Sequence, residues 1–243
     1  MNLVADAEMK RFWDARARED AVFFVDTRQP YRAAGPREFH DAEPIVDLVL
    51  GRLGVGLAPG DAVLDLGCGV GRITRVLAGR VRAVIGLDVS PEMLARARLQ
   101  NPDLDNAEWM QGDGVSLAGI ADASLDACVS LVVFQHFPDP SIALGYVREL
   151  GRTLRPGGWV ALEVSNNPSV HRRRWGPVAR LRARAGRGPG GQGHPAWRGS
   201  ALDLDRLRAV ATDAGLDMVR TVGAGTQYCH VLLRRPPAEP ARP

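Results

Sequence analysis

A doubly wound α/β fold, with a mainly parallel seven-stranded sheet and helices on both faces, is what the sequence predicts. Short apolar runs alternate with segments of helical spacing between residues 62 and 164. The first run, Ala62–Leu66, is apolar enough for a buried parallel strand and passes directly into a glycine-rich turn. With 243 residues, 45% of them hydrophobic and 24% charged, the chain can bury one core of this kind.

The elements are expected in a regular order, without an internal repeat. Residues 1–42 should form a helical lid segment, 43–233 the main domain and 234–243 a Pro-rich, disordered tail. Helical spacing and capping residues predict helices at Glu43–Leu53, Arg72–Ala78, from Ser90-Pro91 onward, Pro140–Leu154 and Leu204–Ala214. Strands are predicted at Ala62–Leu66, Ala83–Asp88, Glu108–Gln111, Asp126–Val133, Trp159–Val164, Met218–Val222 and Tyr228–Leu233, the last two as an antiparallel hairpin at one edge.

Residues 166–200 form an Arg/Gly/Pro-rich insertion between the fifth strand and the next helix. Although the whole chain has a net charge of only +3, this stretch has eight arginines and no acidic residue. One interpretation is a positively charged substrate cover that prefers an anionic partner such as a phosphate or carboxylate. The other is a solvated loop in a protein with a general bias toward arginine.

Several classes of protein are disfavoured by composition. No apolar run approaches the ~20 residues of a membrane span, and residues 1–20 lack the apolar stretch of a secretory leader. The three cysteines are widely spaced, which predicts a reducing, cytoplasmic setting and no metal site. Cys68 lies in a packed turn, where a covalent role is not expected.

The glycine-rich turn is the strongest motif. Residues 63–71 read Val-Leu-Asp-Leu-Gly-Cys-Gly-Val-Gly, so a strand ends in Gly67-x-Gly69-x-Gly71. Glycines at this position let the backbone approach a ligand and present N–H groups at a helix start. The spacing differs from the G-x-G-x-x-G of pyrophosphate binders. The acidic Asp65 before it would repel a pyrophosphate, but it could hold an ammonium group, directly or through water.

Two more acids follow strand ends. Asp88 ends the second predicted strand 21 residues after Gly67, a distance typical of a carboxylate that binds ribose hydroxyls. Asp113 follows the third strand within Gly112-Asp113-Gly114, where it can accept a bond from an exocyclic amine. The carboxyl ends of parallel strands meet at one sheet edge, so Asp65, Asp88 and Asp113 are expected to converge on one ligand.

With these motifs the chain resembles the class I S-adenosylmethionine-dependent methyltransferases of the small-molecule type. The resemblance rests on residues 63–71, Gly86–Ser90, Gln111–Gly114 and Leu154–Gly158, in that order. It implies that the glycines cradle the methionine part of the cofactor, that Asp88 binds the ribose, and that Asp113 and Met93 lie beside the adenine. The same site is expected to include Cys68, Val89, Gly112, Gly114 and Leu131.

Residues for the chemistry are expected after the fourth strand. His136 is the candidate general base, because its ordinary pKa of ~6.5 suits proton transfer near neutral pH; the alternative is a structural role in its loop. Gln135 is a candidate substrate contact. Trp13 belongs to a predicted helix that covers the cofactor, or simply packs on the domain. Further substrate candidates are Tyr31, His171 and Trp175, whereas His230 has no supporting neighbours and is expected to be structural.

The predicted function is transfer of a methyl group to an oxygen or nitrogen atom of a small molecule, with S-adenosylhomocysteine as product. A specialised-metabolite pathway is the expected setting. An RNA methyltransferase is the main alternative, although the chain lacks an RNA-binding module and an Asn/Asp-Pro-Pro-aromatic motif. A nicotinamide dehydrogenase conflicts with the glycine spacing, and a non-catalytic relative conflicts with the intact acids. The sequence does not specify the oligomeric state.

Overall fold

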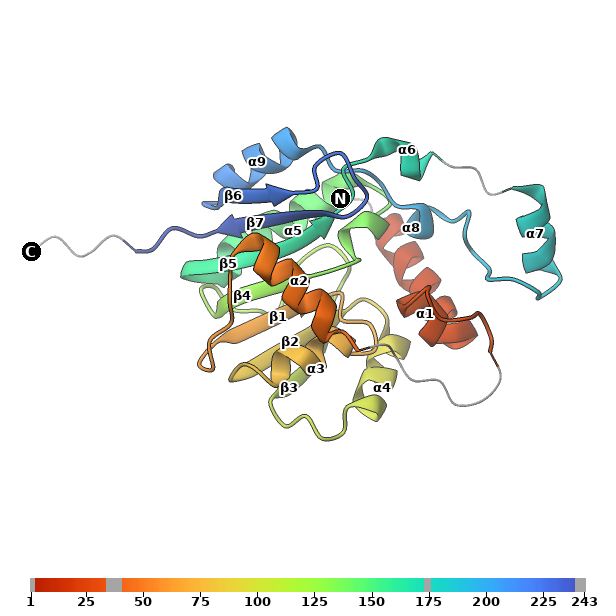
Figure 1. Ribbon diagram of the computed structural model, residues 1–243, viewed down its shortest axis with the longest axis horizontal. Helices are drawn as coiled ribbons and strands as arrows, with labels where there is room; N and C mark the ends of the chain where they lie inside the picture. The colour runs from red at the N-terminus through yellow and green to blue at the C-terminus, as the bar shows by residue number, and fades with distance from the viewer. Residues whose placement is uncertain (1–2, 34–40, 173–175, 239–243) are drawn as a thin grey trace, which may run out of the picture.

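A single seven-stranded sheet forms the centre of the protein in a computed structural model that describes residues 3–33, 41–172 and 176–238. The strand order is β3-β2-β1-β4-β5-β7-β6, with helices on both faces (Figure 1). This confirms the predicted fold class. The strands are β1 Ala62–Leu66, β2 Ala83–Asp88, β3 Ala107–Gln111, β4 Leu125–Ser130, β5 Leu154–Val164, β6 Asp217–Val222 and β7 Cys229–Arg234.

The five strands from β1 to β5 pair in parallel, and the last two run antiparallel to their neighbours. The predicted hairpin at the edge is therefore confirmed. Because β7 pairs with both β5 and β6, the strand that comes last in the chain lies inside the sheet and β6 forms its edge. Parallel pairing places the carboxyl ends of β1, β2 and β3 at the same sheet edge, where the predicted acids lie.

The helices divide between the two faces. Leu144 and Val147 of α5 and Leu207 of α9 pack in one core cluster, whereas Val46 of α2 and Leu77 of α3 pack in the other. Both ends of α2, α3, α5 and α9 were predicted to within one residue, as was the start of α4. The helices are α1 Leu3–Val25, α2 Glu43–Leu53, α3 Arg72–Ala78, α4 Pro91–Gln100, α5 Pro140–Thr153, α6 Pro168–His171, α7 Pro177–Arg184, α8 Pro195–Arg198 and α9 Leu204–Asp213, with a 3₁₀ turn η1 at Phe134–His136.

The fourth strand is shorter than predicted. It ends at Ser130, not at Val133, because its partner β1 ends at Leu66 and turns into the glycine loop. The Ser130 hydroxyl donates to the Leu66 carbonyl at 2.8 Å. Val132 then has a φ of +61°, in the left-handed region that a β-branched residue rarely adopts. The chain thus leaves the sheet at the edge where ligands bind in this kind of fold.

The fifth strand is longer than predicted. It begins at Leu154 and includes the Pro156-Gly157-Gly158 segment as an irregularity, after which its pairing with β4 resumes at Trp159. The Gly157 N–H donates to the carbonyls of Arg235 and Pro236. Part of the predicted tail is therefore hydrogen-bonded to the sheet, and residues 239–243 lie outside the described residues.

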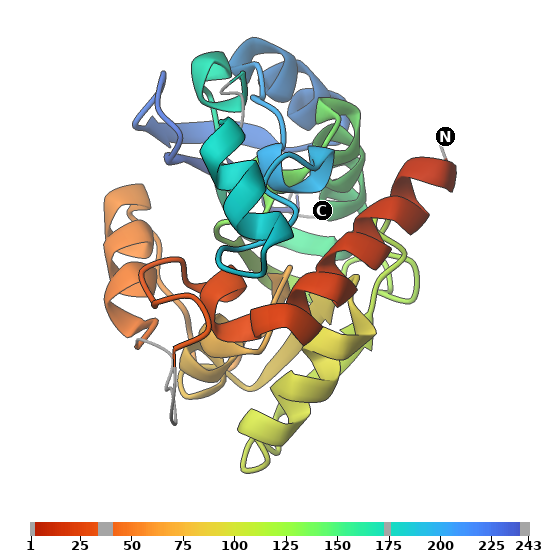
Figure 2. The same cartoon turned by 90° about the vertical axis from the view of Figure 1, so that its right-hand side faces the viewer.

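Two segments far apart in the sequence cover the carboxyl edge of the sheet. Helix α1 bends at Asp20, whose carboxylate accepts the Phe23 N–H and so caps the turn after the bend. The insertion forms α6, α7 and α8, three short helices that were not predicted. Figure 2 shows α1 crossing in front of the sheet, and Figure 1 shows α7 at the end of the molecule, apart from the sheet.

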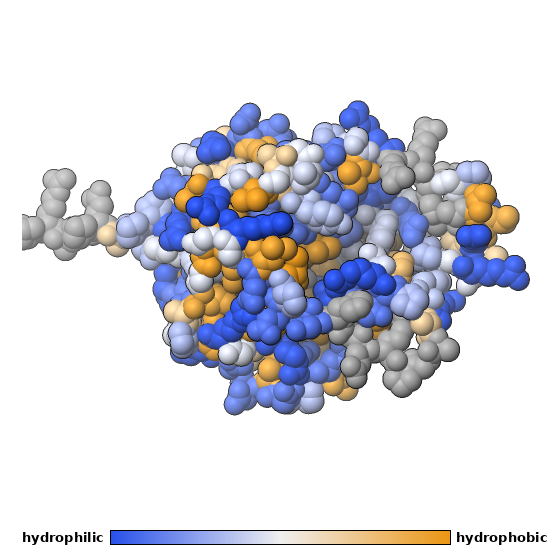
Figure 3. Space-filling view, viewed as in Figure 1, coloured by the Kyte–Doolittle hydropathy of each residue, from blue (hydrophilic) through white to orange (hydrophobic). Residues whose placement is uncertain are grey.

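Helix α7 exposes Val178 and Leu181 beside its arginines. Figure 3 shows apolar atoms at the end of the molecule to which α7 extends. None of the helices in the described part of the chain is sufficiently long and apolar to cross a membrane.

Candidate active site at the carboxyl edge of the sheet

The glycine loop wraps around the tip of β2. The N–H groups of Gly67 and Cys68 both donate to the Leu87 carbonyl, at 2.7 and 3.0 Å. Gly67 has a φ of +80°, and a Cβ atom there would lie 2.4 Å from a methyl group of Val133. Only glycine lets the loop pass so close to the segment after β4. The loop is therefore held between two strand ends.

Asp88 connects the glycine loop to helix α4. One carboxylate oxygen accepts the Gly69 N–H at 2.9 Å, and the other accepts the Ser90 N–H at 2.8 Å. A carboxylate has about four lone-pair sites, so each oxygen can also accept a ligand hydroxyl. Burial raises the pKa of Asp88 above its ordinary value, and the backbone N–H bonds oppose that shift. The result is a carboxylate fixed at the mouth of the loop.

A cavity of about 150 Å³ lies beside this carboxylate. It is lined by nine of the residues predicted for the site, namely Trp13, Gly67, Cys68, Gly69, Asp88, Val89, Met93, Leu131 and His136. Met9 and Phe24 of α1 complete the wall. Asp14, also on α1, accepts the Ser90 hydroxyl at 2.6 Å and so anchors this helix to the start of α4. Helix α1 thus forms one side of the cavity.

Asp65 and Gly71 lie behind the cavity wall. The Asp65 side chain is 1% exposed and accepts the Thr74 hydroxyl at 2.6 Å. Burial raises the pKa of Asp65 to about 7, although the Thr74 hydrogen bond opposes the shift. Gly71 precedes α3 and packs against Trp109, where a Cβ atom would clash. Both residues support the loop from inside the domain.

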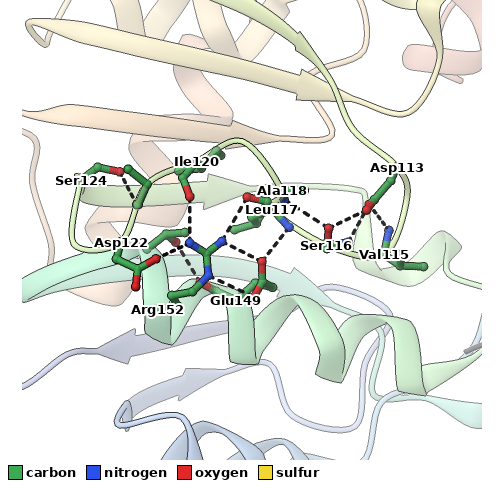
Figure 4. A network of polar contacts seen from close by, with 12 residues as sticks. Asp113, Val115, Ser116, Leu117, Ala118, Ile120, Asp122, Ser124, Glu149 and Arg152 are labelled. Carbon is green, nitrogen blue, oxygen red and sulfur yellow. Dashed lines mark hydrogen bonds and ion pairs between the residues drawn. The ribbon is translucent and has the colours of Figure 1, made fainter.

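Asp113 and its two glycines also lie outside the residues that line the cavity. The Asp113 carboxylate accepts the N–H groups of Val115 and Ser116 and the Ser116 hydroxyl, so it turns into its own loop (Figure 4). Gly112 packs against Leu87, and Gly114 against Met9 and Val89. This loop therefore buttresses the cavity wall at Val89.

A larger chamber of about 860 Å³ adjoins the cavity. The two share seven lining residues, among them Leu131, Val132 and His136. The chamber wall comes from α2, from the segment after α1, from the insertion and from the carboxyl end of β5. A ligand in the small cavity and another in the chamber would therefore meet at the segment after β4.

His136 lies at this junction between aromatic side chains of two distant segments. Its ring packs edge-on against Trp13 of α1, with centroids 5.2 Å apart, and lies 5.5 Å from the ring of Trp197 in α8. Its Nδ1 atom is 3.1 Å from the Trp197 carbonyl. A carbonyl only accepts, so we assign the proton to Nδ1, which leaves a lone pair on Nε2. Gln135 can donate to that lone pair at 3.4 Å.

Burial sets the protonation of two groups in the cavity. It lowers the pKa of His136 to about 4, so the imidazole is neutral at physiological pH. It also raises the pKa of the Cys68 thiol well above its ordinary value. A neutral thiol is a poor nucleophile.

Residues 64–162 match the methyltransferase domain family. Together with the sheet order and the loop that Asp88 holds, this match decides the family. Residues 64–162 belong to the class I S-adenosylmethionine-dependent methyltransferases. The matched segment spans the strands that build the cavity, from β1 to β5.

Curated relatives of this methyltransferase include enzymes of two kinds. The biotin biosynthesis bifunctional protein BioHC of Teredinibacter turnerae is 31% identical over 84% of this chain, which spans 34% of that protein. A ubiquinone biosynthesis O-methyltransferase of Pseudomonas fluorescens is 34% identical over 56% of this chain and 57% of that enzyme. The chain therefore spans a third to just over half of the length of these relatives.

A solved structure shows the same fold. Phosphoethanolamine N-methyltransferase 1 of Haemonchus contortus, bound to phosphoethanolamine and S-adenosylhomocysteine, aligns with a TM-score of 0.70 and 18% identity. The alignment covers 100% of this chain and 51% of that one.

The cavity suits the cofactor of this family. Its polar side carries the Asp88 carboxylate, which would suit ribose hydroxyls, and its apolar side carries Met93 and Leu131, which would suit an adenine ring. The backbone at Gly67–Gly69 also lines the cavity, which suits the methionine part. Within the described ranges, no group of three or more His, Cys, Asp or Glu side chains is placed to hold a metal ion.

The predicted substrate contacts divide between the chamber and other places. Gln135 and His171 line the chamber, where His171 bonds the Ser165 hydroxyl at 2.7 Å. Tyr31 lines neither cavity; its hydroxyl donates to Glu19, and burial raises its pKa to about 12. Trp175 lies outside the described residues.

Four arginines of the chamber were not predicted individually. Arg28, Arg52, Arg72 and Arg198 line it, against the two acidic residues Asp26 and Glu163. Only Arg198 comes from the arginine-rich insertion, and it donates two bonds to the His171 carbonyl. No local sequence motif marks Arg28, Arg52 and Arg72, because only the fold brings them together in the chamber.

Proposed function

We propose that the protein transfers the methyl group of S-adenosylmethionine to an oxygen or nitrogen atom of a small anionic molecule bound in the chamber. The observation that carries the proposal is the junction of the two cavities at His136, beside a chamber with four arginines and two acids. The O-methyltransferase among the relatives supports an oxygen acceptor. The cytoplasmic location remains a prediction of the sequence.

The cofactor supplies an electrophilic methyl group on a positively charged sulfur. The protein has to align an acceptor atom with that methyl group and exclude water. Trp13, Trp197 and Phe24 enclose the junction with apolar surface. Asp88 and the glycine loop hold the cofactor side. Asp26 already pairs with Arg28 and Arg72, so the excess of arginine over acid in the chamber, with Arg52 in particular, attracts the anionic end of the acceptor.

His136 is proposed as the general base through Nε2. Because its pKa is about 4, kcat should be level between about pH 6 and 8 and should fall only as the pH approaches 4. The contribution of neutral His136 to folding stability is complete above pH ~6.5, the pKa in the unfolded chain, and is lost as the pH falls toward 4.

His136→Asn keeps an N–H near the Nδ1 position for the Trp197 carbonyl and removes Nε2, and we expect kcat to fall roughly 100-fold. If His136→Asn has the kcat of the wild type at every pH, His136 has a structural role.

The anionic acceptor can be tested with matched compounds and variants. Calorimetry with S-adenosylhomocysteine and with NADH checks the cofactor. Mass spectrometry then compares the methylation of carboxylates and phosphates with that of their neutral analogues.

Arg52→Gln should raise the KM for an anionic acceptor about three- to tenfold, with a smaller change at high salt. The control is Arg208→Gln on the exposed side of α9, which should change nothing. Preference for neutral acceptors would contradict the proposal, and salt-sensitive methylation of tRNA would favour the RNA alternative.

A further inference from the structure

A buried carboxylate–imidazole pair forms part of the chamber wall, away from His136. Glu163 of β5 and His230 of β7 are directly opposite each other in the antiparallel register. The two residues are 3% and 2% exposed. His230 Nε2 lies 3.1 Å from one Glu163 oxygen, and both residues line the chamber. The reaction described above uses neither of them.

The hydrogen bonds of Glu163 define the tautomer of His230. The second Glu163 oxygen accepts the N–H of Val132 at 3.1 Å, so both oxygens act as acceptors. An ionised carboxylate only accepts, and we therefore assign a proton to Nε2 of His230. In a neutral imidazole this leaves Nδ1 as a hydrogen-bond acceptor.

The Nδ1 atom of His230 is buried and has no hydrogen-bond partner in the described part of the chain. A buried polar atom left unpaired loses its hydrogen bonds to water without replacement, so such atoms are rare in native proteins. In a residue that lines a chamber, a donor group on a ligand can supply the missing bond. The chamber also presents the aromatic rings of Phe24, Trp197 and Tyr228 and the four arginines.

We propose that His230, oriented by Glu163, accepts through Nδ1 a hydrogen bond from a hydroxyl group of the methyl acceptor, and that this acceptor is an aromatic hydroxy acid. The hydroxyl satisfies Nδ1, the aromatic ring packs against the aromatic wall, and the acid group faces the arginines. This inference rests on the proposed methyl transfer and specifies the acceptor that the same chamber takes.

Glu163 is the positioning residue of this arrangement. It holds His230 on one side and, on the other, the N–H of Val132, whose left-handed backbone forms part of both cavities. A β-branched residue in this region is strained and persists there only where its surroundings determine the conformation. Glu163 therefore ties the hydroxyl-binding histidine to the segment where the two cavities meet.

Calorimetry on the S-adenosylhomocysteine complex tests the inference with benzoate and with 2-, 3- and 4-hydroxybenzoate. At least one isomer should bind the wild type roughly tenfold more tightly than benzoate, as one hydrogen bond predicts. His230→Gln keeps an N–H for Glu163 and removes the acceptor at Nδ1, so the preference should disappear. His230→Asn places an amide near the Nδ1 position and should retain part of it.

Nitrogen-15 spectra of the wild type test the tautomer directly. We expect Nε2 of His230 to be protonated and Nδ1 to be bare, with a shift of the Nδ1 resonance on addition of the preferred hydroxybenzoate but not of benzoate. In Glu163→Gln, the single amide oxygen cannot serve both Val132 and His230, and the tautomer ratio should change.

The inference is overturned if no isomer binds better than benzoate, if His230→Gln keeps the full preference, or if Nδ1 carries the proton. Melting temperatures and the affinity for S-adenosylhomocysteine show whether each variant is folded; if a variant does not fold, the wild-type affinities and spectra decide. The proposed methyl transfer stands on its own test, because wild-type protein that methylates a different anionic compound would refute only the aromatic hydroxy acid.

Discussion

Asp88→Ala is expected to weaken S-adenosylhomocysteine binding by roughly 10–100-fold. The variant loses the carboxylate that we assign to the ribose, and each bond from a charged group contributes about 1.5–3 kcal/mol. It also releases the N–H groups of Gly69 and Ser90, so the glycine loop is no longer tied to α4. Both losses act on the same ligand, and calorimetry measures their sum.

Two control variants separate these contributions. Asp88→Asn keeps one oxygen and should bind with intermediate affinity, because an amide oxygen can hold only one of the two N–H groups. Asp103→Ala removes the same charge from an exposed ion pair with Arg75 and should leave binding unchanged. Normal binding by Asp88→Ala would refute the role of the β2 tip as the ribose site.

The parts of the fold that sequence reasoning located best are those with local signals. β1 and β2 are apolar runs that end at a glycine turn and an acidic residue, and both were predicted to the residue. Helix α4 begins at Pro91, directly after its predicted N-cap Ser90, and the Ser90 side chain does accept the Met93 N–H. Burial, turn chemistry and capping are all determined within a few neighbouring residues, so the sequence displays them.

The parts that sequence reasoning missed depend on distant contacts. The end of β4 is set by the length of β1, some 60 residues earlier. Glu163 and His230 lie 67 positions apart, and only the place of β7 beside β5 pairs them. These features depend on the order of the strands in the sheet, which no local pattern displays.

The contact between the insertion and the segment after β4 gives the second large effect. Gly199, just after α8, has φ +59° and ψ −158°, a conformation almost restricted to glycine. A Cβ atom there would lie 1.6 Å from the Gln135 carbonyl oxygen and 2.9 Å from the Cα of His136. These are backbone atoms of η1, which cannot move aside like the end of a side chain. An alanine at this position must separate α8 from η1.

Gly199→Ala is therefore expected to lower the free energy of unfolding by about 3 kcal/mol, from backbone strain and the clash together, and the melting temperature by roughly 6–12 °C. Separation of α8 from η1 also breaks the bond between His136 and the Trp197 carbonyl, so methyl transfer should fall more than the loss of folded protein explains. Gly176→Ala is the matched control for melting temperature in the same insertion, because its φ is −68° and its Cβ would contact nothing within 4 Å. If Gly199→Ala melts like Gly176→Ala and reacts like the wild type, the insertion does not hold His136 in place.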